Sequence, residues 1–155
     1  MFRIVVDLER AIVPGSGLGG FALRSHITEL EELVARIGCS QPGTFRLATA
    51  YEAVYSLGKG EVEIAVDVRN GKVFKLIALP GYRGRLFGQI RVGMLVREAM
   101  ALDQRFYYDE VEELILCRGV PGVAMDVEAV DPPPSLVPPM PISAISVFIP
   151  EIDEL

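Results

Sequence analysis

The sequence contains no tryptophan, one histidine and two cysteines among its 155 residues. A structural zinc site needs several cysteine or histidine ligands at close spacing. His26, Cys39 and Cys117 are too few and too far apart to predict such a site. Two distant cysteines without a CxxC pair favour reduced thiols in a cytoplasmic protein, and a single disulfide between them is the alternative. We expect neither a metal ion nor another cofactor.

Long hydrophobic stretches are also missing. Arg3 and Asp7 interrupt the start of the chain, whereas a secretory signal peptide needs a longer apolar run. The longest uncharged stretch, Pro132 to Pro150, contains seven prolines. Because proline lacks the N–H that a helix needs, this stretch predicts no membrane-spanning helix. We therefore expect a cytoplasmic protein that does not contact a membrane.

Positive charge is in the minority, with 15 Lys and Arg against 21 Asp and Glu and a net charge of −6. Nucleic-acid binding needs a basic face, so nucleic acid is not an expected partner. A basic protein partner fits better, because opposite fields speed the encounter of two proteins. The alternative is that the charge only keeps the protein soluble. The length and the apolar share of 50% suit one compact globular domain.

Hydrophobic periodicity predicts two helices. The first is expected over 27–37, with Ser25 as its N-cap, and the second over 95–102. The apolar face of the first helix would consist of Ile27, Leu30, Leu33, Val34 and Ile37.

Alternating and β-rich segments predict the strands. Asn70-Gly71 is the strongest hairpin signal, because both residues tolerate positive φ. The alternation in 61–68 puts the acids and Ala65 on a solvent face, as in an antiparallel sheet with one wet side. Its buried face, packed against the first helix, would consist of Val62, Ile64, Val66 and Val68. The expected strands are 2–8, 21–23, 50–57, 61–68, 72–79, 111–117, 123–127 and 142–148.

The second half of the chain repeats signals of the first. Gly88 to Val92 aligns with Gly19 to Leu23 at an offset of 69 residues. We therefore expect an α+β protein made of two tandem strand-helix-meander units, with antiparallel sheets and both helices packed on one side. The pseudo-repeat halves would be about 1–82 and 83–155, each with a three-strand meander. Chance similarity between two αβ segments is the alternative.

No motif predicts catalysis. Gly15, Gly17 and Gly20 satisfy G-x-G-x-x-G, but a dinucleotide site needs a helix directly after the glycines, and a short strand follows here. His26 lies in the first turn of the first helix, where a surface or capping role is usual. No nucleophile motif accompanies it, although a catalytic histidine needs both a nucleophile and an orienting partner. We expect the protein not to be an enzyme.

The most distinctive local feature is a run of aromatic residues followed by acids, Phe106 to Glu113. Paired carboxylates can serve acid–base chemistry, but the simplest interpretation is a solvated turn. The third interpretation is an interface, in which tyrosines supply contact area and acids complement a basic partner. The proline-rich connection Asp131 to Pro141 is either a binding loop or a spacer. The candidate partner-binding residues are Tyr107, Tyr108, Asp109, Glu110, Glu112 and Glu113.

The stretch Gly84 to Met94, with the later Tyr108-Asp109-Glu110, resembles uncharacterised bacterial proteins built from two such units. The arrangement is also similar to the tandem-repeat fold of β-lactamase inhibitor proteins and to single-unit outer-membrane assembly lipoproteins. The resemblance covers most of the chain and implies protein binding instead of catalysis. The chain departs from the periplasmic members in lacking a signal peptide, a lipobox cysteine and a disulfide pattern. No contact residue of those families aligns here.

These observations lead to one principal hypothesis and two alternatives. The principal hypothesis is a non-catalytic protein-binding module, of the immunity or inhibitor type, that uses an acidic, tyrosine-bearing surface. The first alternative is a structural homo-oligomeric protein. The second is a small-ligand binder that uses a pocket between the two halves.

Overall fold

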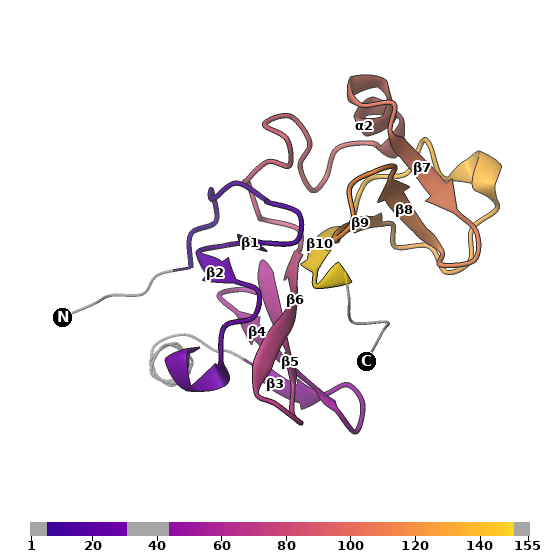
Figure 1. The fold of residues 1–155 in the computed structure, drawn as a ribbon. Helices are drawn as coiled ribbons and strands as arrows, with labels where there is room; N and C mark the ends of the chain where they lie inside the picture. The colour runs from indigo at the N-terminus through magenta and orange to yellow at the C-terminus, as the bar shows by residue number, and fades with distance from the viewer. Residues whose placement is uncertain (1–5, 31–43, 151–155) are drawn as a thin grey trace.

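The computed structural model describes residues 6–30 and 44–150. Within them, strands dominate and helices are few, and both sheets are antiparallel, as expected for the α+β class. The small sheet pairs β1 (Gly17–Leu18) with β2 (Phe21–Ala22). The large sheet has eight strands in the order β3-β4-β5-β6-β10-β9-β8-β7 (Figure 1). These strands are β3 (Thr44–Leu47), β4 (Glu52–Leu57), β5 (Val62–Asp67), β6 (Lys72–Ala78), β7 (Phe106–Asp109), β8 (Leu114–Cys117), β9 (Val123–Asp126) and β10 (Ala144–Phe148).

Strands β6 and β10 form the centre of the large sheet and join its two halves. Their antiparallel register places Ala78 opposite Ile145 and Leu76 opposite Val147. Every other pair in this sheet consists of strands that are consecutive in the chain. As a result, β3 and β7 lie at the two ends of the sheet. No helix in residues 6–30 and 44–150 is long and apolar enough to cross a membrane.

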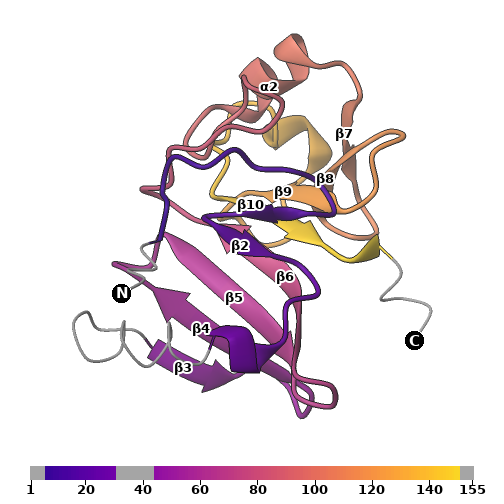
Figure 2. The ribbon, with the colours of Figure 1, turned by 60° about the vertical axis from the view of Figure 1, so that its left-hand side comes forward.

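One face of the large sheet carries the hydrophobic core. The β1–β2 hairpin crosses the sheet beside β6 and β10 (Figure 2), and it contributes buried Leu18 and Phe21. Burying a large apolar side chain contributes about 1.5–3 kcal/mol. A continuous cross-strand row, in which no residue is more than 2% exposed, consists of Leu57, Val62, Ala78, Ile145, Met125 and Ile115.

Several predicted strands are confirmed with slightly shorter bounds, but each half has one strand more than the predicted three-strand meander. Each half contributes four strands to the large sheet, because β3 and β7 extend it at its ends. Each of these edge strands has only four residues. In β7, two consecutive tyrosines interrupt any alternation of apolar and polar residues. The β5–β6 turn around Asn70-Gly71 is confirmed, with Gly71 at a φ of 72°.

The predicted strand over 2–8 is wrong for residues 6–8, and residues 1–5 lie outside the described part. The Asp7 carboxylate accepts the Glu9 N–H at 3.1 Å and the Arg10 Nε–H at 3.2 Å. These contacts fold the segment into a turn. The predicted strand over 111–117 begins only at Leu114, because residues 110–113 form the β7–β8 turn.

The predicted faces of β5 are only partly correct. Val68 is 47% exposed because β5 ends at Asp67 and Val68 lies in the following turn. Ala65 and Asp67, expected on the solvent face, are buried. Ala65 pairs with Val54 of β4 and with Lys75 of β6, and its small side chain is easily covered. The expected buried positions that the structure confirms are Val62, Ile64 and Val66.

The first helix begins at Ile27 as predicted, and its expected core positions Leu33, Val34 and Ile37 lie outside the described residues. Its capping acceptor is His26 and not Ser25, since the Thr28 N–H donates to His26 Nδ1 at 3.2 Å.

The second helix, α2 (Val96–Leu102), agrees with the prediction. Glu98 Oε1 accepts the Leu95 N–H at 3.2 Å and thereby satisfies a free amide at the helix start.

The proline-rich connection between β9 and β10 packs against α2. It contains the 3₁₀ helix η1 (Pro134–Leu136) and the fully buried Val137. The first turn of α2 donates two backbone N–H groups to the carbonyls of Pro138 and Met140, at 2.8 and 2.9 Å. Most of this segment therefore serves as a cover for α2, and only its beginning reaches the candidate surface described next.

Candidate functional site

The six candidate partner-binding residues lie on the end strand β7 and on the β7–β8 turn. Tyr107, Tyr108 and Asp109 belong to β7, whereas the three glutamates belong to the turn over 110–113. The turn residues are exposed, and the strand residues are partly buried. β7 is hydrogen-bonded to β8 on one side only.

Asp109 has a structural role in the turn. Its Oδ1 atom accepts the N–H of Val111 at 2.9 Å and the N–H of Glu112 at 3.0 Å. A carboxylate that accepts the free amides of a turn in this way holds the turn closed. Asp109 therefore fixes the backbone of the turn and with it the positions of the neighbouring side chains.

Tyr107 and Tyr108 point to opposite faces of the sheet, because successive side chains alternate along a strand. Tyr108 packs against the hydrophobic core. Tyr107 lies on the other face, where the guanidinium carbon of Arg118 stands 4.6 Å from its ring centroid. The two tyrosines therefore belong to different surfaces, and Tyr108 lies on the one near Glu110 and Glu113.

The environment of Tyr108 brings together acids from three segments. Burial raises the pKa of its phenol above the usual value of 10.0, so the hydroxyl stays protonated and can donate a hydrogen bond at neutral pH. Negative charges raise this pKa further, in descending order from Glu113, Asp131, Glu110 and Asp126. Asp126 and Asp131 are not among the residues predicted from the sequence, although Asp131 begins the proline-rich connection that the sequence marks as a binding loop or a spacer.

Two valines stand out on this surface. Val111 is 91% exposed in the β7–β8 turn, and Val130 is 92% exposed in the connection that follows β9. The two segments run beside each other at the same end of the sheet (Figure 1). We call this surface the acidic end, and it consists of Tyr108, Glu110, Val111, Glu112, Glu113, Asp126, Val130 and Asp131.

The backbone of the acidic end is strained at two positions. Glu113 has a φ of 58° and Asp131 a φ of 47°. The left-handed region costs a non-glycine residue about 1–2 kcal/mol, although aspartate tolerates it better than most. Strain of this kind is concentrated at functional sites.

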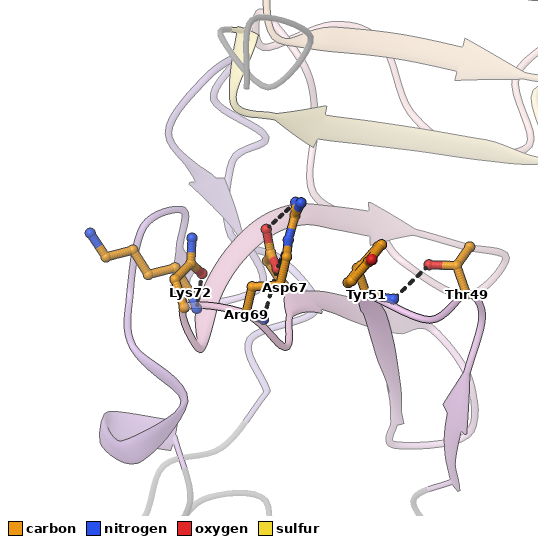
Figure 3. A network of polar contacts seen from close by, with 6 residues as sticks. Thr49, Tyr51, Asp67, Arg69 and Lys72 are labelled. Atoms are coloured by element: carbon orange, nitrogen blue, oxygen red, sulfur yellow. Dashed lines mark hydrogen bonds and ion pairs between the residues drawn. The ribbon is translucent and has the colours of Figure 1, made fainter.

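A second polar cluster lies in the first half of the chain, at the β5–β6 turn (Figure 3). Arg69 binds both oxygens of the buried Asp67, at 3.0 Å through Nε and 2.9 Å through Nη2. Its guanidinium also stacks on the Tyr51 ring, 4.7 Å from the centroid. The hydrogen bond from Arg69 holds the pKa of Asp67 below its usual value of 3.8. Because the charges of this cluster are paired, it stabilises the β5–β6 turn and offers little to a ligand.

The glycine motif, His26 and Cys117 form no catalytic group in the described part of the chain. Gly15, Gly17 and Gly20 surround the β1–β2 hairpin, and no helix opens after them. His26 Nδ1 lies 2.8 Å from the Thr28 hydroxyl, in keeping with its capping role. Burial raises the pKa of the Cys117 thiol, which opposes formation of the reactive thiolate. No group of three or more potential metal ligands occurs among the described residues.

No protein-family model, no curated protein and no solved structure matches this chain. The resemblance to two-unit inhibitor and immunity proteins therefore stays a prediction.

Proposed function

We propose that the chain is a non-catalytic protein-binding module of the immunity or inhibitor type, and that it binds a basic protein partner through the acidic end. Val111 and Val130 would contact an apolar patch of the partner, and the surrounding carboxylates would face lysines and arginines. An apolar centre with a polar rim is the usual anatomy of a protein interface. Opposite charges at the rim would speed the encounter.

The observation that carries this proposal is the exposure of Val111 and Val130. Each valine is more than 90% exposed, and both occur on a surface that is otherwise acidic. The acids that flank them, Glu110 and Asp131, both act on Tyr108, and exposed apolar residues on a charged surface can mark an interaction site. The strained backbone of Glu113 and Asp131 supports the same interpretation.

We also propose that the fold consists of two related units with their helices on one side of the large sheet. Three backbone hydrogen bonds near the start of the first helix recur near α2 at an offset of 69 residues. The first set runs from Arg24 N to Val73 O, from Val73 N to Ser25 O, and from Ile27 N to Gly71 O. The second set runs from Gly93 N to Ile142 O, from Ile142 N to Met94 O, and from Val96 N to Met140 O.

The binding proposal is tested with two charge-reversal variants that change the net charge equally. The test variant is Glu110→Lys/Glu112→Lys at the acidic end. The control is Glu9→Lys/Glu29→Lys, at exposed positions in the N-terminal segment. A partner is first captured from a lysate of the source cells with the tagged wild-type protein and identified by mass spectrometry. Its affinity for each variant is then measured by calorimetry at low and high salt.

We expect the test variant to bind the partner about tenfold more weakly or worse, because close charge pairs across an interface couple by about 1.5–7 kcal/mol. We expect the control to bind like the wild type, and high salt to weaken wild-type binding. Equal affinities for the two variants would remove the acidic end from the interface. A self-association that the test variant abolishes, measured by sedimentation velocity, would favour the homo-oligomeric alternative instead.

A further inference from the structure

The second half of the large sheet has a groove on the face opposite Tyr108. The groove has a volume of about 430 Å³ and lies beside the β8–β9 turn. This volume is within the range of about 300–1,000 Å³ that is usual for small-molecule sites. Its walls are mostly apolar and carry one cation, and they include Tyr107, Leu116, Arg118, Pro121, Phe148 and Pro150.

Arg118 is one of three arginines that stack on an aromatic ring in the described part of the chain. The guanidinium carbons of Arg69, Arg105 and Arg118 lie 4.7, 4.9 and 4.6 Å from the centroids of their rings. A stacked guanidinium is held in orientation by the ring and keeps its hydrogen-bond donors free to point sideways.

The other two stacked arginines each bind a carboxylate two residues earlier in the chain. Arg69 binds Asp67 through Nε at 3.0 Å and Nη2 at 2.9 Å. Arg105 binds Asp103 through the same two nitrogens, at 3.0 and 2.7 Å. Bidentate pairing of this kind is the strongest geometry for a guanidinium and a carboxylate.

Arg118 lacks this internal partner. The residue two positions earlier is Leu116, and Arg118 forms no ion pair with the described residues. No acid is among the described residues that line the groove. Because burial raises the pKa of the neighbouring Cys117 thiol, the thiol stays neutral. Among the described residues, Arg118 therefore has an aromatic stacking partner but no carboxylate partner, and it lies beside an apolar groove.

We propose that this groove binds a small organic carboxylate with an apolar body. The carboxylate would bind Arg118 Nε and Nη2 as Asp67 binds Arg69, and the apolar body would lie against Leu116, Phe148 and Pro121. A single planar guanidinium suits one carboxylate, whereas a phosphate dianion would need more positive charge. This site is separate from the acidic end and does not depend on the proposed function.

The test is a titration of the ¹⁵N-labelled full-length protein, followed through the amide signals of Gly119 and Gly122, which line the groove. The ligands are sodium hexanoate, its neutral counterpart hexanamide, sodium acetate and inorganic phosphate. The variants are Arg118→Gln and the control Arg97→Gln, which removes an equal charge from the exposed side of α2. A third variant, Leu116→Asp, supplies Arg118 with the internal carboxylate that the other stacked arginines have.

We expect saturable shifts with hexanoate and an affinity at least about tenfold lower for hexanamide and acetate. Hexanamide lacks the charged carboxylate, and acetate lacks the apolar chain. Arg118→Gln should lower hexanoate affinity by a similar factor, Leu116→Asp should prevent binding, and Arg97→Gln should leave it unchanged. The proposal would be overturned if hexanoate caused no saturable shift, or if hexanamide or phosphate bound as well as hexanoate. An Arg118→Gln variant with unchanged affinity would also overturn it.

Discussion

Replacing Glu113 with glycine should make the folded protein more stable, although most substitutions destabilise a protein. Glu113 is the last residue of the β7–β8 turn, and its φ of 58° lies in the left-handed region. Glycine reaches this region without the steric conflict of a Cβ atom. The Glu113 side chain forms no hydrogen bond or ion pair with the described residues, so none of these would be lost.

The size of the effect follows from two opposing contributions. Relief of the left-handed conformation contributes about 1–2 kcal/mol to the free energy of unfolding. The greater freedom of glycine in the unfolded chain costs about 0.5–1 kcal/mol. The net stabilisation should therefore be between about 0 and 1.5 kcal/mol, with a central value of about 0.8 kcal/mol. For a chain of this size the central value corresponds to a rise in Tm of about 1.5–3 °C.

Glu112 provides a matched control, since it is the neighbouring residue, is also exposed and does not have a positive φ. Glu112→Gly removes the same charge but relieves no strain, so it should lower the free energy of unfolding by about 0.5–1 kcal/mol. Urea unfolding and calorimetric Tm values of both variants check the prediction. If Glu113→Gly were no more stable than Glu112→Gly, the strain attributed to Glu113 would not exist.

Two further predictions concern buried polar contacts. The hydroxyl of Tyr82, which is 2% exposed, accepts the Gly19 N–H at 2.7 Å and donates to the Arg10 carbonyl at 2.6 Å. Tyr82→Phe should therefore cost about 1–3 kcal/mol in urea unfolding, and Tyr51→Phe, at an exposed ring, should cost much less. Because the folded pKa of Asp67 lies below its unfolded value of 3.8, its ion pair stabilises the fold above about pH 4, and the stabilisation is lost as the pH falls through the folded pKa. The stability difference between wild type and Asp67→Asn should thus shrink between neutral pH and about pH 3, and a constant difference would contradict the assignment.

Local signals in the sequence predict much of the fold. The Asn70-Gly71 turn and α2 follow from backbone preferences that neighbouring residues do not overrule. The burial of Val62 and Ile64 follows from alternation in a central strand. The exposure of Val68 could not be predicted in this way, because the alternation continues past the point where Asp67 and Arg69 close the turn.

The sequence did not predict that the candidate residues lie on two faces of the sheet, because it did not predict strand β7. When Phe106 to Asp109 is treated as irregular, Tyr107 and Tyr108 look like one surface. Once the segment is a strand, alternation assigns its two tyrosines to opposite faces. The contribution of Asp131 could not be predicted from local sequence, since it comes from a segment that is distant in the chain and adjacent in the sheet.

The same alternation makes the two proposed surfaces independent of each other. Both depend on β7, but the acidic end uses Tyr108 and the groove uses Tyr107 and Arg118. Charge reversal at Glu110 and Glu112 changes no residue that lines the groove, and Arg118→Gln removes no residue of the acidic end. A partner that loses affinity for the first variant and not for the second would therefore bind on the Tyr108 face. Hexanoate should lose affinity only for the second variant, and it would then bind on the Tyr107 face.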